Sequence, residues 1–390
     1  MGVREKRKII ILGCTGSIGT TALQALLPYV KDFEIVGLSA HSSYKDLIHI
    51  ANQWNCNTIC LSKEDPSLYE KEQLPPGLVF YTGKDGLLDM IRNTKADIVL
   101  NGIAGSSGLA PTFAAIESNK NVALANKESI VMAGNLLFSH ARNLGVTIIP
   151  VDSEHSTIDA LIQAHGIKNI QKLVITASGG PFRNFSADQM ENITVAMAVS
   201  HPTWQMGAKI SIDSATLANK GLEVIEASYL FGFDSKNIEV VIHPQSIVHS
   251  MIRLHNGAVY GQLSPPDMAL PIMSAIADSH IHLKDIVKPL DFTSLTLQFM
   301  KPDFDRFPLL KIAFEAIEKK ASYPIAFNAA NEIAVQAFID EMIDFNQIAT
   351  VVKATFEHDW SMTYTSLDEI VLIDSSVRTL ARHVIRGLVE

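Results

Sequence analysis

The sequence predicts an α/β protein with an N-terminal Rossmann-type, doubly wound parallel sheet, a central α+β domain and a C-terminal α-helical domain. Three observations support this prediction. Residues 8–151 alternate between short β-branched runs and helical stretches, residues 152–280 mix strand and helix signals, and strand signals disappear after residue 308. Regular alternation of strands and helices is typical of a parallel sheet covered by helices.

The first domain, residues 1–151, is expected to hold the parallel sheet. Its predicted strands are the β-branched segments 8–12, 34–38, 58–61, 78–81, 97–101, 122–125 and 146–151. Helical patterns between most of these strands predict helices at 17–29, 44–52, 86–93, 109–118 and 128–143. This order of elements is the basis of the Rossmann-type prediction.

The rest of the chain is expected to form two further domains and a linker. Residues 152–280 predict strands at 172–176, 239–242 and 258–263 and a helix at about 214–230. Residues 281–307 are polar, contain prolines and show weak periodicity, so we expect a linker there. Residues 308–390 carry amphipathic patterns that predict helices at 308–320, 323–340, 346–356 and 374–387.

Composition narrows the class of protein. The chain has 390 residues, of which 47% are hydrophobic and 19% charged, so it can bury a large core. A net charge of -9 argues against a nucleic-acid partner. The first residues contain neither a signal-peptide pattern nor a membrane-spanning run. Three sparse cysteines fit a reducing compartment without disulfides, and we expect them to be small buried side chains. We therefore expect a cytoplasmic protein.

A glycine-rich loop follows the first predicted strand. It reads Gly13-Cys14-Thr15-Gly16-Ser17-Ile18-Gly19, a Gly-x-x-Gly-x-x-Gly variant of the dinucleotide-binding pattern. Such glycines allow a tight turn and a close approach of backbone amides to a pyrophosphate, which the next helix N-terminus also favours. A turn chosen only for its sharpness is the alternative. The position of the loop in the first strand–helix unit favours the dinucleotide site.

The end of the second predicted strand favours NADP over NAD. NAD enzymes usually carry an acid there that binds the ribose 2′-hydroxyl. This chain instead reads Leu38-Ser39-Ala40-His41-Ser42-Ser43, without an acid. His41, Ser42 and Ser43 could donate hydrogen bonds to a 2′-phosphate, which a carboxylate would repel. A solvated loop histidine explains His41 about equally well.

Two carboxylates near the end of the last predicted strand could bind a cation. Asp152 and Glu154 are two residues apart, with Ser153 between them and His155 after them. In an extended segment both carboxylates would point the same way and reach one hard cation through oxygen. The same residues suit a helix N-terminus, where Asp152 or Ser153 would cap the helix and acids are favoured. This stretch by itself is compatible with both interpretations.

Polar side chains also occur on the apolar helix predicted at about 214–230. Asn219, Lys220 and Glu223 lie within about one helical turn. Lys220 offers a point charge for a phosphate, Asn219 and Ser214 offer neutral donors, and Glu223 offers a third carboxylate. The alternative is a lysine–glutamate pair on a solvated face.

Two loops could contact the same ligand. Residues 178–183 read Ser-Gly-Gly-Pro-Phe-Arg after a strand, so their amides could bind an anion or could form an ordinary turn. Residues 201–207 read His-Pro-Thr-Trp-Gln-Met-Gly, a composition that suits a lid that excludes water. An ordinary loop with a packed tryptophan has the same composition.

Together these stretches resemble the 1-deoxy-D-xylulose 5-phosphate reductoisomerase family. Further motifs carry the resemblance, namely Asn126-Lys127-Glu128-Ser129, residues 209–226 and Ile242-His243-Pro244-Gln245-Ser246. It spans residues 8 to about 275 with the motifs in order, and the helical tail is similar to the family's third domain.

The resemblance implies a catalytic central domain and a reaction. The family converts 1-deoxy-D-xylulose 5-phosphate to 2-C-methyl-D-erythritol 4-phosphate by rearrangement and reduction, with NADPH and Mg²⁺, Mn²⁺ or Co²⁺, in non-mevalonate isoprenoid synthesis. It also implies a phosphorylated small-molecule substrate, a homodimer, and neither a nucleic-acid nor a membrane partner. A related dehydrogenase that needs no metal and an inactive NADP-binding regulatory protein are the alternatives.

The resemblance also implies a role for each matching residue. The implied metal ligands are Asp152, Glu154 and Glu223. The implied catalytic residues are Lys127, Glu154 and His201. The implied substrate-binding residues are Ser153, Ser178, His201, Trp204, Ser214, Asn219, Lys220 and Glu223. The implied cofactor-binding residues are Gly13, Thr15, Gly16, Ser17, Ile18, His41, Ser42, Asn126, Met206 and Gly207.

One loop departs from the family's pattern. Many members carry a Gly-Lys-Asn-like sequence after the second strand, where this chain has Ala40-His41-Ser42. The 2′-phosphate would then be held less firmly, or partly by protonated His41. We still expect NADPH to be preferred over NADH.

Overall fold

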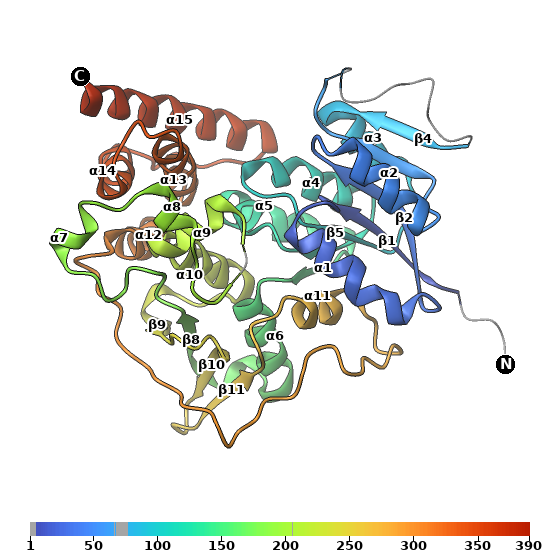
Figure 1. The fold of residues 1–390 in the computed structure, drawn as a ribbon, viewed down its shortest axis with the longest axis horizontal. Helices are drawn as coiled ribbons and strands as arrows, with labels where there is room; N and C mark the ends of the chain where they lie inside the picture. Colours follow the sequence, from blue (N-terminus) through green and yellow to red (C-terminus); the bar gives the residue numbers. More distant parts are fainter. Residues whose placement is uncertain (1–4, 66, 68–76, 205) are drawn as a thin grey trace. The chain divides into compact units, whose positions relative to one another are not determined.

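The computed structural model describes residues 5–65, 67, 77–204 and 206–390, which form two compact units (Figure 1). The first unit comprises the described residues of segments 1–129, 137–156 and 267–288, and the second comprises segments 130–136, 157–266 and 289–390. Each unit has its own sheet. The division of the chain into domains at residues 151, 280 and 307 stays a prediction.

The first unit contains a seven-stranded sheet in the order β4-β3-β2-β1-β5-β6-β7. The strands are β1 (Arg7–Leu12), β2 (Phe33–Ala40), β3 (Thr58–Leu61), β4 (Val79–Thr82), β5 (Ile98–Asn101), β6 (Asn121–Leu124) and β7 (Ile148–Pro150). Every pairing in this sheet is parallel, so the predicted doubly wound sheet is confirmed. The strand order reverses between β1 and β5, and ligands of such sheets bind in the crevice at this reversal.

Helices of the first unit connect and cover these strands. They are α1 (Ser17–Leu26), α2 (Tyr44–Gln53), α3 (Gly83–Asn93), α4 (Leu109–Glu117), α5 (Lys127–Leu144, of which residues 130–136 belong to the second unit) and α11 (Ala269–Ile276). The sequence did not predict α11, which is distant in sequence from the sheet. Ile272 and Met273 of α11 share a buried core with Ile9, Ile11 and Leu26, so α11 completes the apolar cover of β1 and α1.

The second unit contains a four-stranded mixed sheet in the order β11-β10-β8-β9. The strands are β8 (Ile170–Ala177), β9 (Ile238–Ile242), β10 (Val248–Leu254) and β11 (Val259–Leu263). β8 and β9 are parallel, while β10 is antiparallel to β8 and β11. The sequence did not predict β10, whose buried positions include the polar residues His249 and Ser250.

The helices of the second unit fall into two groups. The first group is α6 (Ser153–His165, which begins in the first unit), α7 (Ala187–Met190), α8 (Val195–Val199), α9 (Ala208–Ala215) and α10 (Ala218–Phe231). The C-terminal group is α12 (Pro308–Lys319), α13 (Tyr323–Ile339), α14 (Phe345–Phe356) and α15 (Leu367–Val389), which confirms the predicted helical tail.

The single helix predicted at 214–230 is wrong, because the chain forms α9 and α10 with a break between them. Leu217 has φ 60°, a left-handed conformation that a continuous helix does not contain. Thr216 ends α9, and its hydroxyl accepts a hydrogen bond from the amide of Ala218, where α10 begins. Ser214 and Asn219 therefore lie on different helices.

Two simpler predictions are also tested. Cys14, Cys56 and Cys60 are buried and free, as expected, and burial raises their pKa values to about 12, 11 and 12. Helices that combine the length and hydropathy needed to span a membrane are absent from the described part of the chain.

Candidate active site

The dinucleotide loop connects β1 to α1 in a turn that only glycine can make. Gly13 has φ 74°, and a Cβ atom at Gly19 would collide with the main chain of Gly13 and Cys14. The amide of Gly13 donates to Ser39 Oγ at 3.2 Å, which ties the loop to the end of β2. Gly16 has no side chain to cap α1, and it is exposed next to Ser17. The helix N-terminus is therefore open to an anion.

Asn126 shapes the neighbouring loop at the sheet reversal. Its amide nitrogen donates to the carbonyl oxygens of Ile103 and Gly105 at 2.7 and 2.8 Å. Its oxygen accepts from the amide of Ser129 at 2.9 Å, which caps α5. The side chain thus fixes the loop that faces Gly13, since a Cβ atom at Gly13 would lie 3.2 Å from the carbonyl oxygen of Gly102. Direct contact of Asn126 with the cofactor stays a prediction.

His41 and Ser42 lie where the 2′-phosphate site is predicted. They follow β2 directly and both are exposed. His41 Nδ1 lies 3.2 Å from Ser62 Oγ, which orients the ring. The first acid after β2 is Asp46, in the first turn of α2.

Asp152 organises the carboxylate-bearing part of the first unit. It precedes α6, and its Oδ1 accepts a hydrogen bond from the amide of Glu154 at 3.2 Å, so the helix N-terminus interpretation is correct. Ser153 and Glu154 thus belong to a helix and not to an extended segment, and both carboxylates lie at one helix end. Their binding of a cation stays a prediction. Lys127 Nζ lies 2.6 Å from Asp152 Oδ2. His155 Nδ1 lies 3.3 Å from Asp152 Oδ1, and Ser153 Oγ donates to Glu154 at 2.5 Å.

The second unit brings Asn219, Lys220 and Glu223 together on α10, as predicted. Asn219 Nδ2 donates to one carboxylate oxygen of Glu223 at 2.6 Å, and Lys220 Nζ donates to the other. The solvated-face interpretation is wrong, because Lys220 is only 4% exposed and Glu223 1%. Buried charges of opposite sign need such pairing to offset the loss of hydration.

The Ser178 loop packs against the end of α9. Gly179 and Gly180 follow β8 with φ 82° and 67°, so the chain reverses sharply there. A Cβ atom at Gly180 would lie 2.7 Å from the carbonyl oxygen of Ser214. Ser178 and Ser214, which the family resemblance assigns to one ligand, are thus brought close by an approach that requires glycine. The amide of Gly180 donates to Ser178 Oγ at 3.2 Å.

His201 connects this loop to the predicted lid. Its Nε2 lies 3.0 Å from Ser178 Oγ, and its Nδ1 accepts from the amides of Thr203 and Trp204 at 3.2 and 2.9 Å. Burial, and to a smaller extent the positive charge of Arg183, lowers the pKa of His201 from 6.5 to about 4.

The rest of the predicted lid contacts a histidine that the sequence did not single out. The Trp204 ring meets the His249 ring edge to face, with centroids 6.2 Å apart. His249 Nε2 lies 3.1 Å from the carbonyl oxygen of Ser264, and burial lowers its pKa. Met206 and Gly207 lead into α9, and Gln205 lies outside the described residues. No local sequence pattern marks His249, because its burial follows from the packing of the strand that carries it.

Comparisons with known proteins cover nearly the whole chain. Family models described as 1-deoxy-D-xylulose 5-phosphate reductoisomerase, its C-terminal domain, and DXP reductoisomerase C-terminal domain match residues 9–134, 148–231 and 263–380. A 1-deoxy-D-xylulose 5-phosphate reductoisomerase from Treponema denticola is 44% identical over 96% of both chains. The enzyme of that name from Zymomonas mobilis is 41% identical over 98% of this chain and 99% of its own.

Solved structures agree with these relatives. A crystal structure of DOX-P reductoisomerase in complex with NADPH, fosmidomycin and magnesium has a TM-score of 0.91 and 39% identity, and covers 98% of this chain and 99% of its own. The Zymomonas mobilis reductoisomerase in complex with NADPH has a TM-score of 0.90 and 39% identity over the same shares. Similarity at this level extends to the complete fold.

Proposed function

The chain belongs to the 1-deoxy-D-xylulose 5-phosphate reductoisomerase family, and on that premise we propose which of its residues carry out the family's reaction. The enzyme converts 1-deoxy-D-xylulose 5-phosphate to 2-C-methyl-D-erythritol 4-phosphate with NADPH and a divalent metal in isoprenoid synthesis. The observation that carries the proposed roles is the buried cluster of Asn219, Lys220 and Glu223. It provides a cation for a phosphate and a carboxylate for a metal within one helical turn.

Asp152, Glu154 and Glu223 are the proposed metal ligands. Carboxylate oxygens are the donors that Mg²⁺ and Mn²⁺ prefer, and Mg²⁺, Mn²⁺ and Co²⁺ all suit this donor set. When bound, the metal supplies Lewis-acid stabilisation of negative charge on the hydroxyketone oxygens of the substrate. Lys127 and Lys220 each balance the charge of one proposed ligand when the metal is not bound.

Lys220, Asn219, Ser178 and Ser214 are the proposed phosphate-binding residues. Lys220 supplies the charge, and the other three supply neutral donors. A dianionic phosphate and a divalent metal carry opposite charges. When both bind, Lys220 can turn to the phosphate and Glu223 to the metal without leaving a net buried charge.

Lys127 and Ser153 are proposed to contact the oxygens of the reacting carbons. Lys127 is buried and begins α5, so its ammonium can donate to an oxygen in a site shielded from water. Glu154 is proposed to take part in proton transfer as well as in metal binding. His201 and Trp204 are proposed to close over the substrate, which would exclude water from reactive fragments.

NADPH, which supplies the hydride, is proposed to bind along the carboxyl end of the parallel sheet. Its pyrophosphate would lie at the N-terminus of α1, on the loop of Gly13, Thr15, Gly16, Ser17 and Ile18. His41 and Ser42 would contact the 2′-phosphate, while Met206 and Gly207 would lie near the nicotinamide. Asn126 would hold the facing loop, and its main chain would be close enough to contact the cofactor.

We also propose that the enzyme is a cytoplasmic homodimer. β11 lies at the edge of the four-stranded sheet, and Val259, Tyr260 and Leu263 on it are exposed. An exposed apolar edge strand favours pairing with a second chain. Sedimentation of the purified protein at the mass of one chain would refute the dimer.

The support for a cytoplasmic location is that the three cysteines are free, as expected in a reducing compartment. Cell fractionation tests this location.

The deciding experiment is NADPH oxidation with 1-deoxy-D-xylulose 5-phosphate, measured after chelation and again after Mg²⁺ or Mn²⁺ is restored. We expect oxidation only with the metal. Equal oxidation without metal would favour a related dehydrogenase and remove the carboxylates from their proposed role. Binding of NADPH by folded protein without any oxidation would favour an inactive regulatory protein.

A further inference from the structure

Arg306 binds the main chain of the segment that follows the Ser178 loop. Its NH1 donates to the carbonyl oxygen of Phe185, and its NH2 donates to that of Arg183 at 3.2 Å. Its Nε donates to Asp303 Oδ2 at 2.7 Å, so the carboxylate sets the plane of the guanidinium. One side chain near the end of the predicted linker thus ties two carbonyls of a distant loop, two residues apart, to the start of α12.

These contacts continue to Ser178. Arg183 NH1 donates to the carbonyl oxygen of Gly180 at 3.1 Å, and the amide of Gly180 donates to Ser178 Oγ at 3.2 Å. Phe182, between them, is buried and packs against the rings of Phe185 and Phe345. Hydrogen bonds therefore connect Arg306 to Arg183, Arg183 to Gly180, and Gly180 to the Ser178 hydroxyl that is proposed to bind the phosphate.

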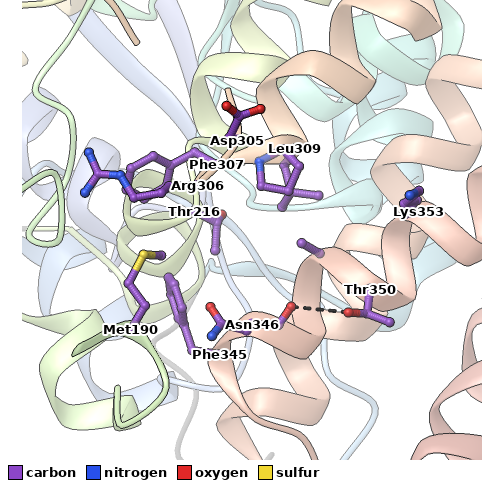
Figure 2. A pocket seen from close by; sticks show the side chains of 12 residues that line it. Met190, Thr216, Asp305, Arg306, Phe307, Leu309, Phe345, Asn346, Thr350 and Lys353 are labelled. Atoms are coloured by element: carbon purple, nitrogen blue, oxygen red, sulfur yellow. Dashed lines mark hydrogen bonds between the residues drawn. The ribbon is translucent and has the colours of Figure 1, made fainter. Parts of the chain in front are cut away.

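A cavity lies beside Arg306. It has a volume of about 330 Å³ and is lined by Met190, Thr216, residues 305–309, Phe345, Asn346, Ala349, Thr350 and Lys353. Figure 2 shows Arg306 and Lys353 at opposite ends of this cavity. Arg306 lines this cavity and also donates hydrogen bonds to the carbonyl oxygens of Arg183 and Phe185, two residues that lie outside the lining.

We propose that Arg306 is a positioning residue for the substrate phosphate: by fixing the carbonyls of Arg183 and Phe185 it holds Gly180 and Ser178 in the conformation that binds the phosphate. The inference rests on the proposed function, because it needs Ser178 to bind that phosphate. Lysine cannot replace arginine here, since an ammonium lacks the rigid planar fork that reaches three acceptors at once.

The test is Arg306→Lys, with Arg378→Lys as the matched control. Arg378 lies in the same unit and binds Asp374 of α15 and Glu332 of α13 through the same kind of fork, at 2.6 and 2.5 Å. We expect R306K to raise the KM for 1-deoxy-D-xylulose 5-phosphate about tenfold, the loss expected for a charged hydrogen-bond network. It should also weaken inhibition by inorganic phosphate. The kcat and the KM for NADPH should stay near wild type.

The controls separate positioning from general stability. A merely structural role would lower the melting temperature and the active fraction in R306K and R378K alike, without raising the KM for substrate. A second variant, Asp303→Asn, keeps Arg306 but weakens its orientation, so it should raise the same KM to a smaller extent. It decides the matter if R306K does not fold. Unchanged KM and phosphate inhibition in R306K or, failing that, in D303N would overturn the inference. Wild-type protein that does not turn over the substrate would instead overturn the proposed function.

Discussion

His201 Nε2 lies 3.0 Å from Ser178 Oγ while Nδ1 of the same ring accepts two backbone amides. A ring nitrogen that accepts N–H groups carries no proton, so neutral His201 is protonated at Nε2 and donates to Ser178. The amide of Gly180 also donates to Ser178 Oγ. With both of these donors on its oxygen, the hydroxyl of Ser178 is left to point its own proton at an acceptor, as phosphate binding requires.

The first prediction separates the two nitrogens of His201. His201→Asn keeps an acceptor near Nδ1 for the amides but loses the donor to Ser178. We expect its KM for 1-deoxy-D-xylulose 5-phosphate to rise about tenfold, with the KM for NADPH unchanged. Steady-state kinetics in a Ser178→Ala background provide the control, because the two changes should then be far from additive. Additive effects would mean that His201 does not act through Ser178.

The second prediction concerns pH. The pKa of His201 is about 4 in the folded protein, below its ordinary value of 6.5, because burial disfavours the charged ring. The unfolded chain therefore binds this proton at a higher pH, so His201 favours folding above pH 6.5 and this contribution is lost as pH falls toward 4. Urea unfolding at pH 7 and pH 4.5 should show a smaller loss of stability in His201→Asn than in wild type. If wild type and the variant lose the same stability between these pH values, a group other than His201 accounts for the pH dependence.

The third prediction tests the metal ligands through Glu223→Gln. The change keeps the shape of the side chain and an oxygen for Asn219, but it removes the charge that a divalent metal binds. We expect kcat to fall by at least about a hundredfold and half-maximal activation to need more Mg²⁺.

Asp213→Asn is the matched control for Glu223→Gln. Asp213 is a buried carboxylate on α9 whose lysine partner, Lys209, lies 2.8 Å away. It also accepts from Asn331 Nδ2 at 2.7 Å, so its change should lower stability and leave the Mg²⁺ titration unaltered. A wild-type Mg²⁺ response in E223Q would remove Glu223 from the ligand set.

Local chemistry determined how much of this structure the sequence could predict. The parallel strands were predictable because both of their faces are buried, which produces uninterrupted apolar runs such as residues 9–12. The turn at Gly13 was predictable because steric contact excludes other residues there. In contrast, β10 buries His249, and Leu217 adopts a left-handed conformation within an apolar sequence. Tertiary contacts decide both of these features, and no local pattern encodes them.

The candidate site follows the same division. Asn219, Lys220 and Glu223 could be grouped because helical spacing alone places them on one face. Arg306 and Phe185 are 121 residues apart, so their contact follows only from the complete fold. The sequence places Asn126 at the start of a helix. Its hydrogen bonds to the carbonyl oxygens of Ile103 and Gly105 could not be predicted, because they depend on how two loops pack.

The last prediction concerns the choice between NADPH and NADH. His41 and Ser42 are exposed directly after β2, where NAD enzymes carry an acid. Ser42→Asp introduces that acid, which should repel the 2′-phosphate and could accept from a 2′-hydroxyl. We expect kcat/KM for NADPH to fall about tenfold or more, because contacts between like charges are unfavourable. The kcat/KM for NADH should stay the same or rise. Ser42→Asn is the control, because it has nearly the same size and no charge. If S42D and S42N lower kcat/KM for NADPH equally, the effect is steric and the 2′-phosphate lies elsewhere.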